Sequence, residues 1–336
     1  MVHRAADLFT QQEANRRKSS WLLLGFVFFF AWIGFGADIA LYLMPAEAGV
    51  RHGVPWVGIV ATALAAGLAW SAWRFGHRQV LWSTRAMELI TPVTPEQQRL
   101  VNVVEEMAIA AGLPRPSIWI VPDEDPNAFA TGPEPAQAAI AVTEGLLARL
   151  DRDELQAVVA HEFAHIARYD TRLMTLVAAM VGVIALMSDG MGRMLFHSQR
   201  ATGALGRGMA RRAGGRRLGQ MGPALPLVLV LWLVSLLAAP VVSRLLSMAI
   251  SRKREFLADA TAAQYTRNPA ALARALRALE DVRTPTLAVG RGAAALCIVD
   301  PSDRRFQRWK GAAGDLFASH PSIEERVRRL EQMGAR

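Results

Sequence analysis

The sequence predicts an α+β fold, in which a mainly helical integral membrane protein carries a soluble domain with a small β-sheet. Three observations support this class. Hydrophobic residues make up 52% of the 336-residue chain, which is above the usual range for a soluble protein. Several nearly uncharged runs are long enough to cross a bilayer as helices. Outside these runs, capped helices alternate with short segments rich in β-branched residues.

Residues 1–90 are predicted to form an N-terminal membrane anchor with two transmembrane helices, at about 20–44 and 53–73. A single charged residue interrupts the first run and none interrupts the second. Trp56 and Trp73 lie near the ends of the second run, where amphipathic rings prefer the membrane interface. No clear cleavage site follows the first run, so an uncleaved anchor is favoured over a removed signal peptide. Two buried core helices of a soluble protein are the other alternative.

The distribution of basic residues predicts that both ends of this anchor face the cytoplasm. The loop between the two runs carries little charge beyond Glu47 and Arg51. Cytoplasmic flanks of membrane helices are enriched in Lys and Arg. Basic residues precede the first run and follow the second, namely Arg16, Arg17, Lys18, Arg74, Arg78 and Arg85.

Residues 91–170 are predicted to form the first half of the soluble domain. Thr94 is placed to begin a helix as its N-cap, and Gly112 is placed to end it. The β-branched and aromatic run 117–121 and the short apolar run 138–142 are typical of strands. A helix and two short strands are therefore expected before the next helical segment.

The segment 171–250 is predicted to form a second hydrophobic hairpin, with apolar runs at about 171–188 and 222–243. The loop between these runs carries seven arginines. If the hairpin spans fully, this basic loop lies outside, against the usual tendency of short basic loops. A re-entrant hairpin that keeps the arginines in the cytoplasm is the alternative. Residues 251–336 are expected to form the second half of the soluble domain, with helices at ALARALRALED and SIEERVRRLEQM.

Composition limits the ligands and partners of this domain. The formal net charge is +9, but no compact basic motif interleaved with aromatic residues is present, so no nucleic-acid partner is expected. Cys297 is the only cysteine, which excludes an internal disulfide and a cysteine-based zinc cluster. Any metal ion must therefore be held by histidines and carboxylates.

The string HEFAH lies in a helix that Asp151 and Glu154 can cap. His161 and His165 are four residues apart, so they project from one helical face and can bind one tetrahedral ion such as zinc. Glu162 lies beside them, where it can act as a general base. The alternative is that both histidines are ordinary helix residues with local hydrogen bonds.

A third ligand is available in the string SRKREFLADA. Glu255 and Asp259 stand four residues apart and share a helical face. Glu255 can complete a set of two histidines and a glutamate, and Asp259 can accept the outer N–H of a ligand histidine. The alternative is surface pairing of both carboxylates with their basic neighbours Arg252, Lys253 and Arg254.

Together these motifs resemble the HtpX-type membrane zinc metalloproteases, a gluzincin-like group related to the endopeptidases that process CAAX-prenylated proteins. The likeness covers most of the chain and includes HEFAH, REFLADA, NAFATG, AVTEGLL and SHPSIEERVRRL. It implies a catalytic core that faces the cytoplasm, with Glu162 as the catalytic base. It also implies one Zn²⁺ per chain, bound by His161, His165 and Glu255.

The same resemblance implies residues that contact the substrate. His320 would help to stabilise the oxyanion, and Arg326 would support that region. On pattern alone, Arg326 is equally well explained as a solvated cation. NAFATG would line the cleft as an edge strand to which an extended peptide can add, although such a strand is more often core by pattern alone. Its residues are Asn127, Ala128, Phe129 and Ala130.

The expected function is that of a multi-pass, membrane-bound zinc endopeptidase that hydrolyses membrane or misfolded proteins on the cytoplasmic side. The resemblance suggests a role in membrane protein quality control, in the inner membrane if the source is bacterial. The expected partners are protein substrates and the lipid bilayer, and no pattern indicates an oligomeric state. A catalytically silent membrane adaptor that retains the fold is the alternative. Charged residues around HEFAH argue against a protease whose motif lies within the bilayer.

Overall fold

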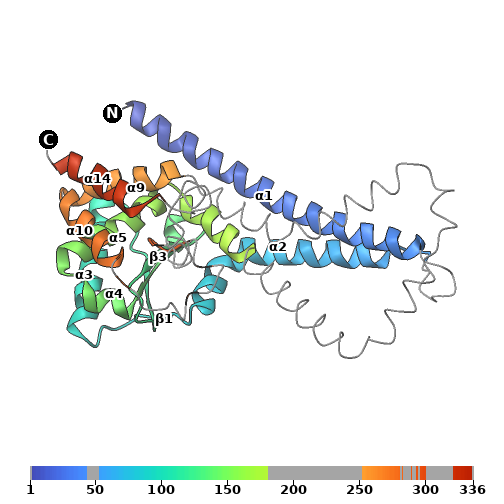
Figure 1. Ribbon diagram of the computed structural model, residues 1–336, viewed down its shortest axis with the longest axis horizontal. Helices are drawn as coiled ribbons and strands as arrows, with labels where there is room; N and C mark the ends of the chain where they lie inside the picture. Colours follow the sequence, from blue (N-terminus) through green and yellow to red (C-terminus); the bar gives the residue numbers. More distant parts are fainter. Residues whose placement is uncertain are drawn as a thin grey trace. The chain divides into compact units, whose positions relative to one another are not determined.

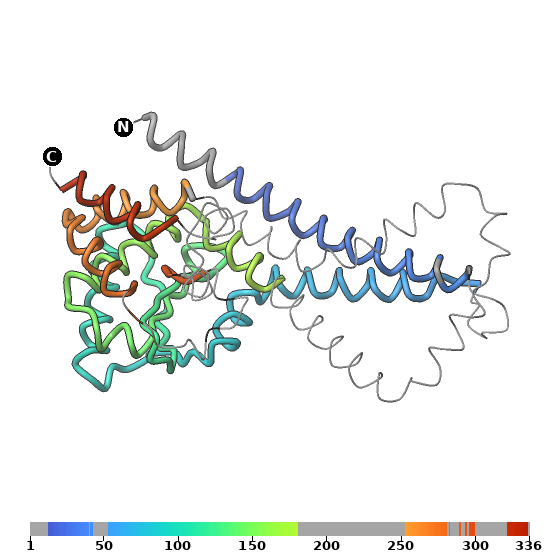
Figure 2. Tube along the Cα trace, viewed as in Figure 1, coloured from blue at the N-terminus to red at the C-terminus, as the bar shows by residue number. Residues whose placement is uncertain are grey.

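The computed structural model describes residues 2–43, 53–180, 252–280 and 321–334, together with 282, 289, 293 and 296–299 (Figures 1 and 2). The chain divides into two units. The first contains Met1–Ser20, Ser71–Gly182 and Leu245–Arg336, and the second contains Trp21–Trp70 and Val183–Arg244. Of the predicted second hairpin, only 171–180 are described, and they are helical. The rest of that hairpin and His320 lie outside the described residues.

Two described helices are long and apolar enough to cross a membrane. The first candidate span is Glu13–Ile39 within α1 (Val2–Leu43), and the second is α2 (Trp56–Ser83). Large apolar side chains on both helices are exposed, which is unusual for core helices of a soluble protein. They include Trp21, Leu24, Phe28, Trp56, Leu64 and Trp70. The predicted spans are helical over residues 20–43 and 56–73, and α1 begins earlier, in the polar leader, where no Gly or Pro interrupts it.

Asp38, the single charge in the first apolar run, lies against the start of α2. Its carboxylate accepts hydrogen bonds from the backbone N–H groups of Val57 at 3.2 Å and Gly58 at 2.6 Å. The first N–H groups of a helix have no partners within the helix, and the positive end of the helix dipole favours an anion there. Asp38 therefore joins the two helices of the second unit.

Gly34 allows α1 and α2 to approach closely. A Cβ atom at Gly34 would lie 2.7 Å from the Ala61 Cβ and 2.9 Å from the Gly58 Cα, whereas a Cβ at Gly25 would meet nothing within 4 Å. We expect Gly34→Ala to destabilise the helix pair by about 1–3 kcal/mol, because backbone must move to relieve the overlap. Thermal unfolding in detergent measures this, with Gly25→Ala on the same helix as control. Equal midpoints for the two variants would contradict the close packing.

The described residues of the first unit include a four-stranded sheet with the order β1-β2-β4-β3. Its strands are β1 (Met87–Glu88), β2 (Ser117–Val121), β3 (Ala128–Thr131) and β4 (Ala139–Thr143). β2 and β4 are parallel, whereas the pairs β1–β2 and β3–β4 are antiparallel. The two strands predicted from pattern are confirmed as β2 and β4. β3 lies at the edge, as the resemblance implied.

Alternate residues of the sheet enter two different apolar clusters. Ile118, Ile140 and Val142 pack with helices on one face, and Val121, Phe129 and Ala141 pack on the other. The second face is covered in part by residues from the end of α2 and from the helical stretch 170–180. Burial on both faces explains why β4 reads as a continuous apolar run instead of an alternating one.

Six further helices of the first unit are described, besides a short 3₁₀ turn at Pro135–Gln137. Three of them precede residue 181: α3 (Pro95–Ala111), α4 (Glu144–Arg149) and α5 (Arg152–Ala167). The other three follow residue 251: α9 (Arg252–Thr266), α10 (Pro269–Glu280) and α14 (Ile323–Gly334). The predicted caps are confirmed: the Thr94 hydroxyl accepts the Gln97 N–H, and Asp151 and Glu154 form a capping box. α9 and α10 pack on α5 (Figure 1), so chain segments about ninety residues apart form one core.

Candidate active site

The HEFAH motif lies in the buried half of α5. His161, Glu162 and His165 are each less than 5% exposed. Apolar residues of the same helix, among them Val158, Val159 and Phe163, are fully buried around them. Burial of three ionisable groups on one helix is costly unless they are paired with one another or with a cation. Their partners therefore determine what this helix can do.

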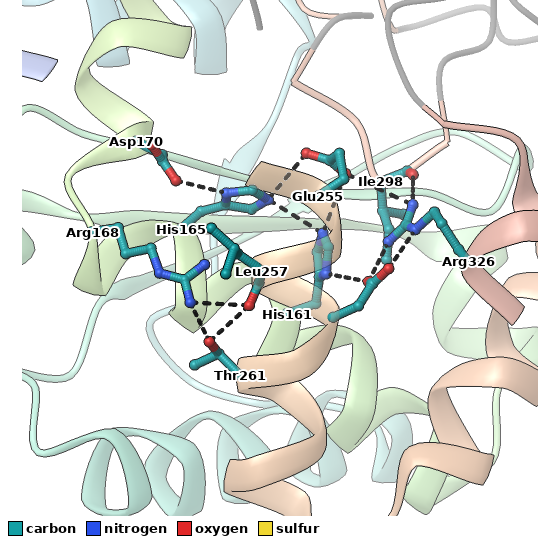
Figure 3. Close-up of polar contacts among 10 residues, drawn as sticks. His161, His165, Arg168, Asp170, Glu255, Leu257, Thr261, Ile298 and Arg326 are labelled. Carbon is teal, nitrogen blue, oxygen red and sulfur yellow. Dashed lines mark hydrogen bonds and ion pairs between the residues drawn. The ribbon is translucent and has the colours of Figure 1, made fainter. Parts of the chain in front are cut away.

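Three side chains converge on one point between α5 and α9 (Figure 3). The Nε2 atoms of His161 and His165 are 3.2 Å apart, and Glu255 oxygens lie 3.7 Å from the first and 3.5 Å from the second. Ligand atoms about 2.0–2.1 Å from a tetrahedral zinc ion lie about 3.3–3.4 Å from one another. The two imidazoles and the carboxylate thus fit one divalent metal ion in both spacing and donor type.

Asp259 and Arg326 support the His161 side of this cluster. Asp259 Oδ1 lies 3.0 Å from His161 Nδ1, as the sequence predicted for one ligand histidine. Arg326, on α14, donates to Asp259 from Nε at 2.9 Å and from Nη2 at 2.7 Å, and to the Ile298 carbonyl at 3.0 Å. Burial alone would raise the pKa of Asp259, but the Arg326 guanidinium and the His161 hydrogen bond hold it below its usual value.

Arg326 has no solvated head group in this arrangement. The residue is 1% exposed, and its guanidinium contacts Asp259 and a backbone carbonyl. The resemblance implied a place near the substrate, and the pattern alone was equally consistent with a place on the surface. Neither indicated a partner 67 residues away. α14 carries Arg326 on its buried side with Ile323, Val327 and Leu330. This spacing is the signal that could have marked Arg326 as buried.

We expect Asp259→Asn to destabilise the metal-free protein by up to about 3–5 kcal/mol at pH 7, because the buried Arg326 loses its hydrogen-bonded counter-ion and keeps only the Glu255 carboxylate at 3.8 Å. A carboxylate with a lowered folded-state pKa stabilises the fold above its unfolded pKa of about 3.9, and that stabilisation is lost as the pH falls through the folded value. The difference between the variant and the wild type should therefore shrink on acidification below about pH 4.

Thermal unfolding in detergent with a chelator, over a pH series, measures this difference. Asp153→Asn is the matched control, since Asp153 lies exposed on α5. A gap that stayed constant down to the lowest pH would show that the charge of Asp259 is unimportant.

Asp170 supports the His165 side and was not predicted as a site residue. Its Oδ2 lies 3.5 Å from His165 Nδ1. Burial lowers the pKa of His165, but Asp170 and Glu255 outweigh that effect and raise it to about 9. The negative surroundings that retain a proton on His165 would equally favour a divalent cation in its place. In the sequence, Asp170 is a charged residue that follows α5 and lies five residues after His165. This short separation is the signal that could have indicated a contact with the motif.

Glu162 is suited to proton transfer near neutral pH. Burial is the largest influence and raises its pKa to about 7, with Glu255 adding to the rise while His165 and the Ala130 backbone oppose it. A group whose pKa lies close to the working pH can both accept and return a proton. The Ala130 hydrogen bond also places β3 beside this carboxylate.

The four predicted substrate contacts around β3 are buried against other parts of the chain. Asn127 donates from Nδ2 to the Val299 carbonyl at 2.8 Å, and the Ala128 carbonyl accepts the Ile298 N–H at 3.0 Å. Phe129 packs in the second apolar cluster. The backbone of Ala130 remains the part of β3 that faces Glu162.

A helix that carries H-E-x-x-H, with two histidines able to bind a metal ion and a glutamate able to act as base, is the pattern of the HExxH metallopeptidases. In this chain a glutamate from a second helix joins the two histidines, as in the sites that hold zinc by two histidines and a glutamate. Comparison with known proteins agrees. The sequence model of Peptidase family M48 matches residues 94–334. The chain belongs to peptidase family M48.

Curated relatives extend the likeness to nearly the whole chain. A protease HtpX homologue of Tropheryma whipplei (strain Twist) is 39% identical over 319 residues, which are 95% of this chain and 97% of that protein. HtpX homologues of Dictyoglomus turgidum and Streptococcus gordonii are each 36% identical and share 96% and 97% of this chain, covering 94% and 100% of their own lengths. These findings confirm the HtpX-type resemblance and favour a membrane-associated metallopeptidase over a silent adaptor.

Proposed function

We propose that this chain is a zinc-dependent endopeptidase that hydrolyses peptide bonds of membrane or misfolded proteins on the cytoplasmic side of the membrane. The convergence of His161, His165 and Glu255 beside the buried Glu162 carries the proposal. Relatives named as protease HtpX homologues support the peptidase activity, and the HtpX-type resemblance suggests a role in membrane protein quality control. The basic residues that flank the two candidate spans support a multi-pass topology with a cytoplasmic catalytic unit.

His161, His165 and Glu255 would hold one Zn²⁺ per chain. When bound there, zinc supplies a Lewis acid that polarises the substrate carbonyl and makes water more acidic. Two imidazoles and one carboxylate leave a tetrahedral ion with an open position, as in catalytic zinc sites. A third ligand from glutamate is the pattern of gluzincin-like peptidases. Asp259 fixes the orientation of the His161 ring, and Asp170 lies in the equivalent place behind His165.

Glu162 would act as general base and then as general acid. Its carboxylate takes a proton from the attacking water and returns that proton to the nitrogen of the leaving amine. In the metal-free protein, burial raises the pKa of Glu162 to about 7, which favours the return of the proton, whereas a bound cation would favour the ionised form that accepts it. We further propose that His320 stabilises the oxyanion, on the strength of the HtpX resemblance.

The part of the β3 edge next to Glu162, at Ala130, is the proposed substrate platform, because the Ala128 carbonyl already accepts the Ile298 N–H. An extended peptide can add to a strand edge through backbone hydrogen bonds, which gives affinity with little sequence preference. Within the proposed contact segment, Asn127–Ala130, the Ala130 backbone lies nearest to Glu162. Asn127 would shape this edge through its bond to Val299. Arg326 would act through Asp259 on the orientation of His161 instead of contacting substrate.

Casein cleavage by the detergent-solubilised full chain tests the proposed function. Wild type and Glu162→Gln are compared at equal, measured zinc content. Zinc binding with cleavage that depends on Glu162 supports a zinc peptidase. Zinc binding without such cleavage would support the adaptor, the alternative that retains the fold without hydrolysis.

A further inference from the structure

Asn15, in the polar leader of α1, is buried in the first unit while its neighbours in the leader are exposed. The residue is 6% exposed, whereas Glu13, Ala14, Arg16 and Arg17 all face solvent. One helical turn on, Ser19 is fully buried and donates its hydroxyl to the Asn15 carbonyl at 2.9 Å. This turn of α1 therefore packs against the rest of the first unit through a narrow stripe of two residues, Asn15 and Ser19.

The Asn15 side chain uses both ends of its amide on residues far away in sequence. Its Nδ2 donates to Asp170 Oδ1 at 2.9 Å and to the Arg168 carbonyl at 3.3 Å. Its Oδ1 accepts from Arg254 Nη2 at 3.0 Å. A carboxylate requires a donor and a guanidinium requires an acceptor, and the side-chain amide of Asn15 supplies both.

These two partners lead directly to metal ligands on different helices. Asp170 faces His165 Nδ1 at 3.5 Å, as Figure 3 shows, and Arg254 precedes Glu255 in α9. Arg254 Nη1 also lies 3.4 Å from Asp170 Oδ1. Asn15 thus bridges the segment after α5 and the start of α9, between which the chain runs through more than 80 residues.

We propose that Asn15 is a positioning residue of the metal site: the amide holds Asp170 in place behind His165 and aligns the turn of α9 that carries Glu255. The inference rests on the proposed function, because it concerns the same metal site. Residues that orient metal ligands through a second hydrogen bond influence both affinity and activity. The N-terminal leader is accordingly part of the catalytic unit as well as the start of an anchor.

Asn15→Ala tests this in the full chain in detergent, with Glu13→Ala, an exposed leader residue two positions away, as the matched control. We expect the zinc dissociation constant, measured by competition with a chelator, to rise about tenfold, the lower end of the range for residues that orient ligands. We expect kcat to fall with KM nearly unchanged, and the absorption spectrum of the Co²⁺-substituted protein to change. Glu13→Ala should stay within about twofold of wild type.

A double-mutant cycle separates positioning from simple stabilisation. If Asn15 acts through Asp170, then Asn15→Ala should weaken zinc binding little further in an Asp170→Asn background, because coupled residues are not additive. Additive losses in zinc affinity would overturn the proposal. So would a lowered unfolding temperature of Asn15→Ala with zinc affinity and Co²⁺ spectrum equal to those of Glu13→Ala. Wild type that binds no zinc would overturn the proposed metal site itself, and the inference with it.

Discussion

Glu162→Gln is expected to lower kcat for casein by about 10³-fold, within the range of 10² to 10⁴ that general acid–base catalysis contributes. The substitution keeps the size of the side chain and removes its ability to take a proton. Glu162 lies beside the three proposed ligands without belonging to the set, so zinc content should stay the same. KM should change little, because the lost interaction matters mainly in the transition state.

The comparison needs zinc content and casein hydrolysis measured on the same preparation. Glu105→Gln, an exposed residue on α3, controls for the change from carboxylate to amide. Hydrolysis by Glu162→Gln at the wild-type rate, with zinc retained, would exclude Glu162 as the base.

Glu255→Gln is expected to weaken zinc binding by about 100-fold or more. Structural zinc sites with four ligands contribute about 10–16 kcal/mol in total, so one ligand accounts for about 3 kcal/mol, and each 1.4 kcal/mol is a factor of ten. An amide oxygen carries no charge to offset the cation. Glu255 is buried at 1% exposure, so solvent can do little to replace the lost negative charge.

Competition with a chelator, followed by casein hydrolysis as zinc is added back, measures this effect. Glu324→Gln, at an exposed position of α14, is the control. A Glu255→Gln protein with wild-type zinc affinity would show that the third ligand comes from another residue.

Local signals predicted the parts of the fold that depend on neighbouring residues. The caps at Thr94 and Asp151 require only a side chain three residues from its backbone partner, so a short string contains them. Glu255 and Asp259 share a face because helical spacing requires it, which led to the third proposed ligand. In contrast, β1 consists of two residues, which form a strand only because they pair with β2. A pattern of two residues is too short to predict a strand from sequence.

The site residues that could not be predicted from the sequence depend on contacts between distant segments. Asn15 and Asp170 are 155 residues apart, and Arg326 lies 67 residues from Asp259. Each of these polar residues reads as an ordinary surface group, because its partner arrives through tertiary packing. Arg326 illustrates this. Its charge suggested that the side chain faces solvent or contacts substrate, and only the packing of α14 on the core directs it toward Asp259.

The spread of these groups along the chain also determines when during protein synthesis the site can exist. A nascent chain that has reached residue 170 carries Asn15, His161 and His165 but neither Glu255 nor Asp259. Two imidazoles without a carboxylate form a weak zinc site, and Asp259, which contacts His161, gains its partner Arg326 only with α14. Since domains fold as their segments emerge from the ribosome, the full set of side chains around His161 can come together only after residue 326 has been translated.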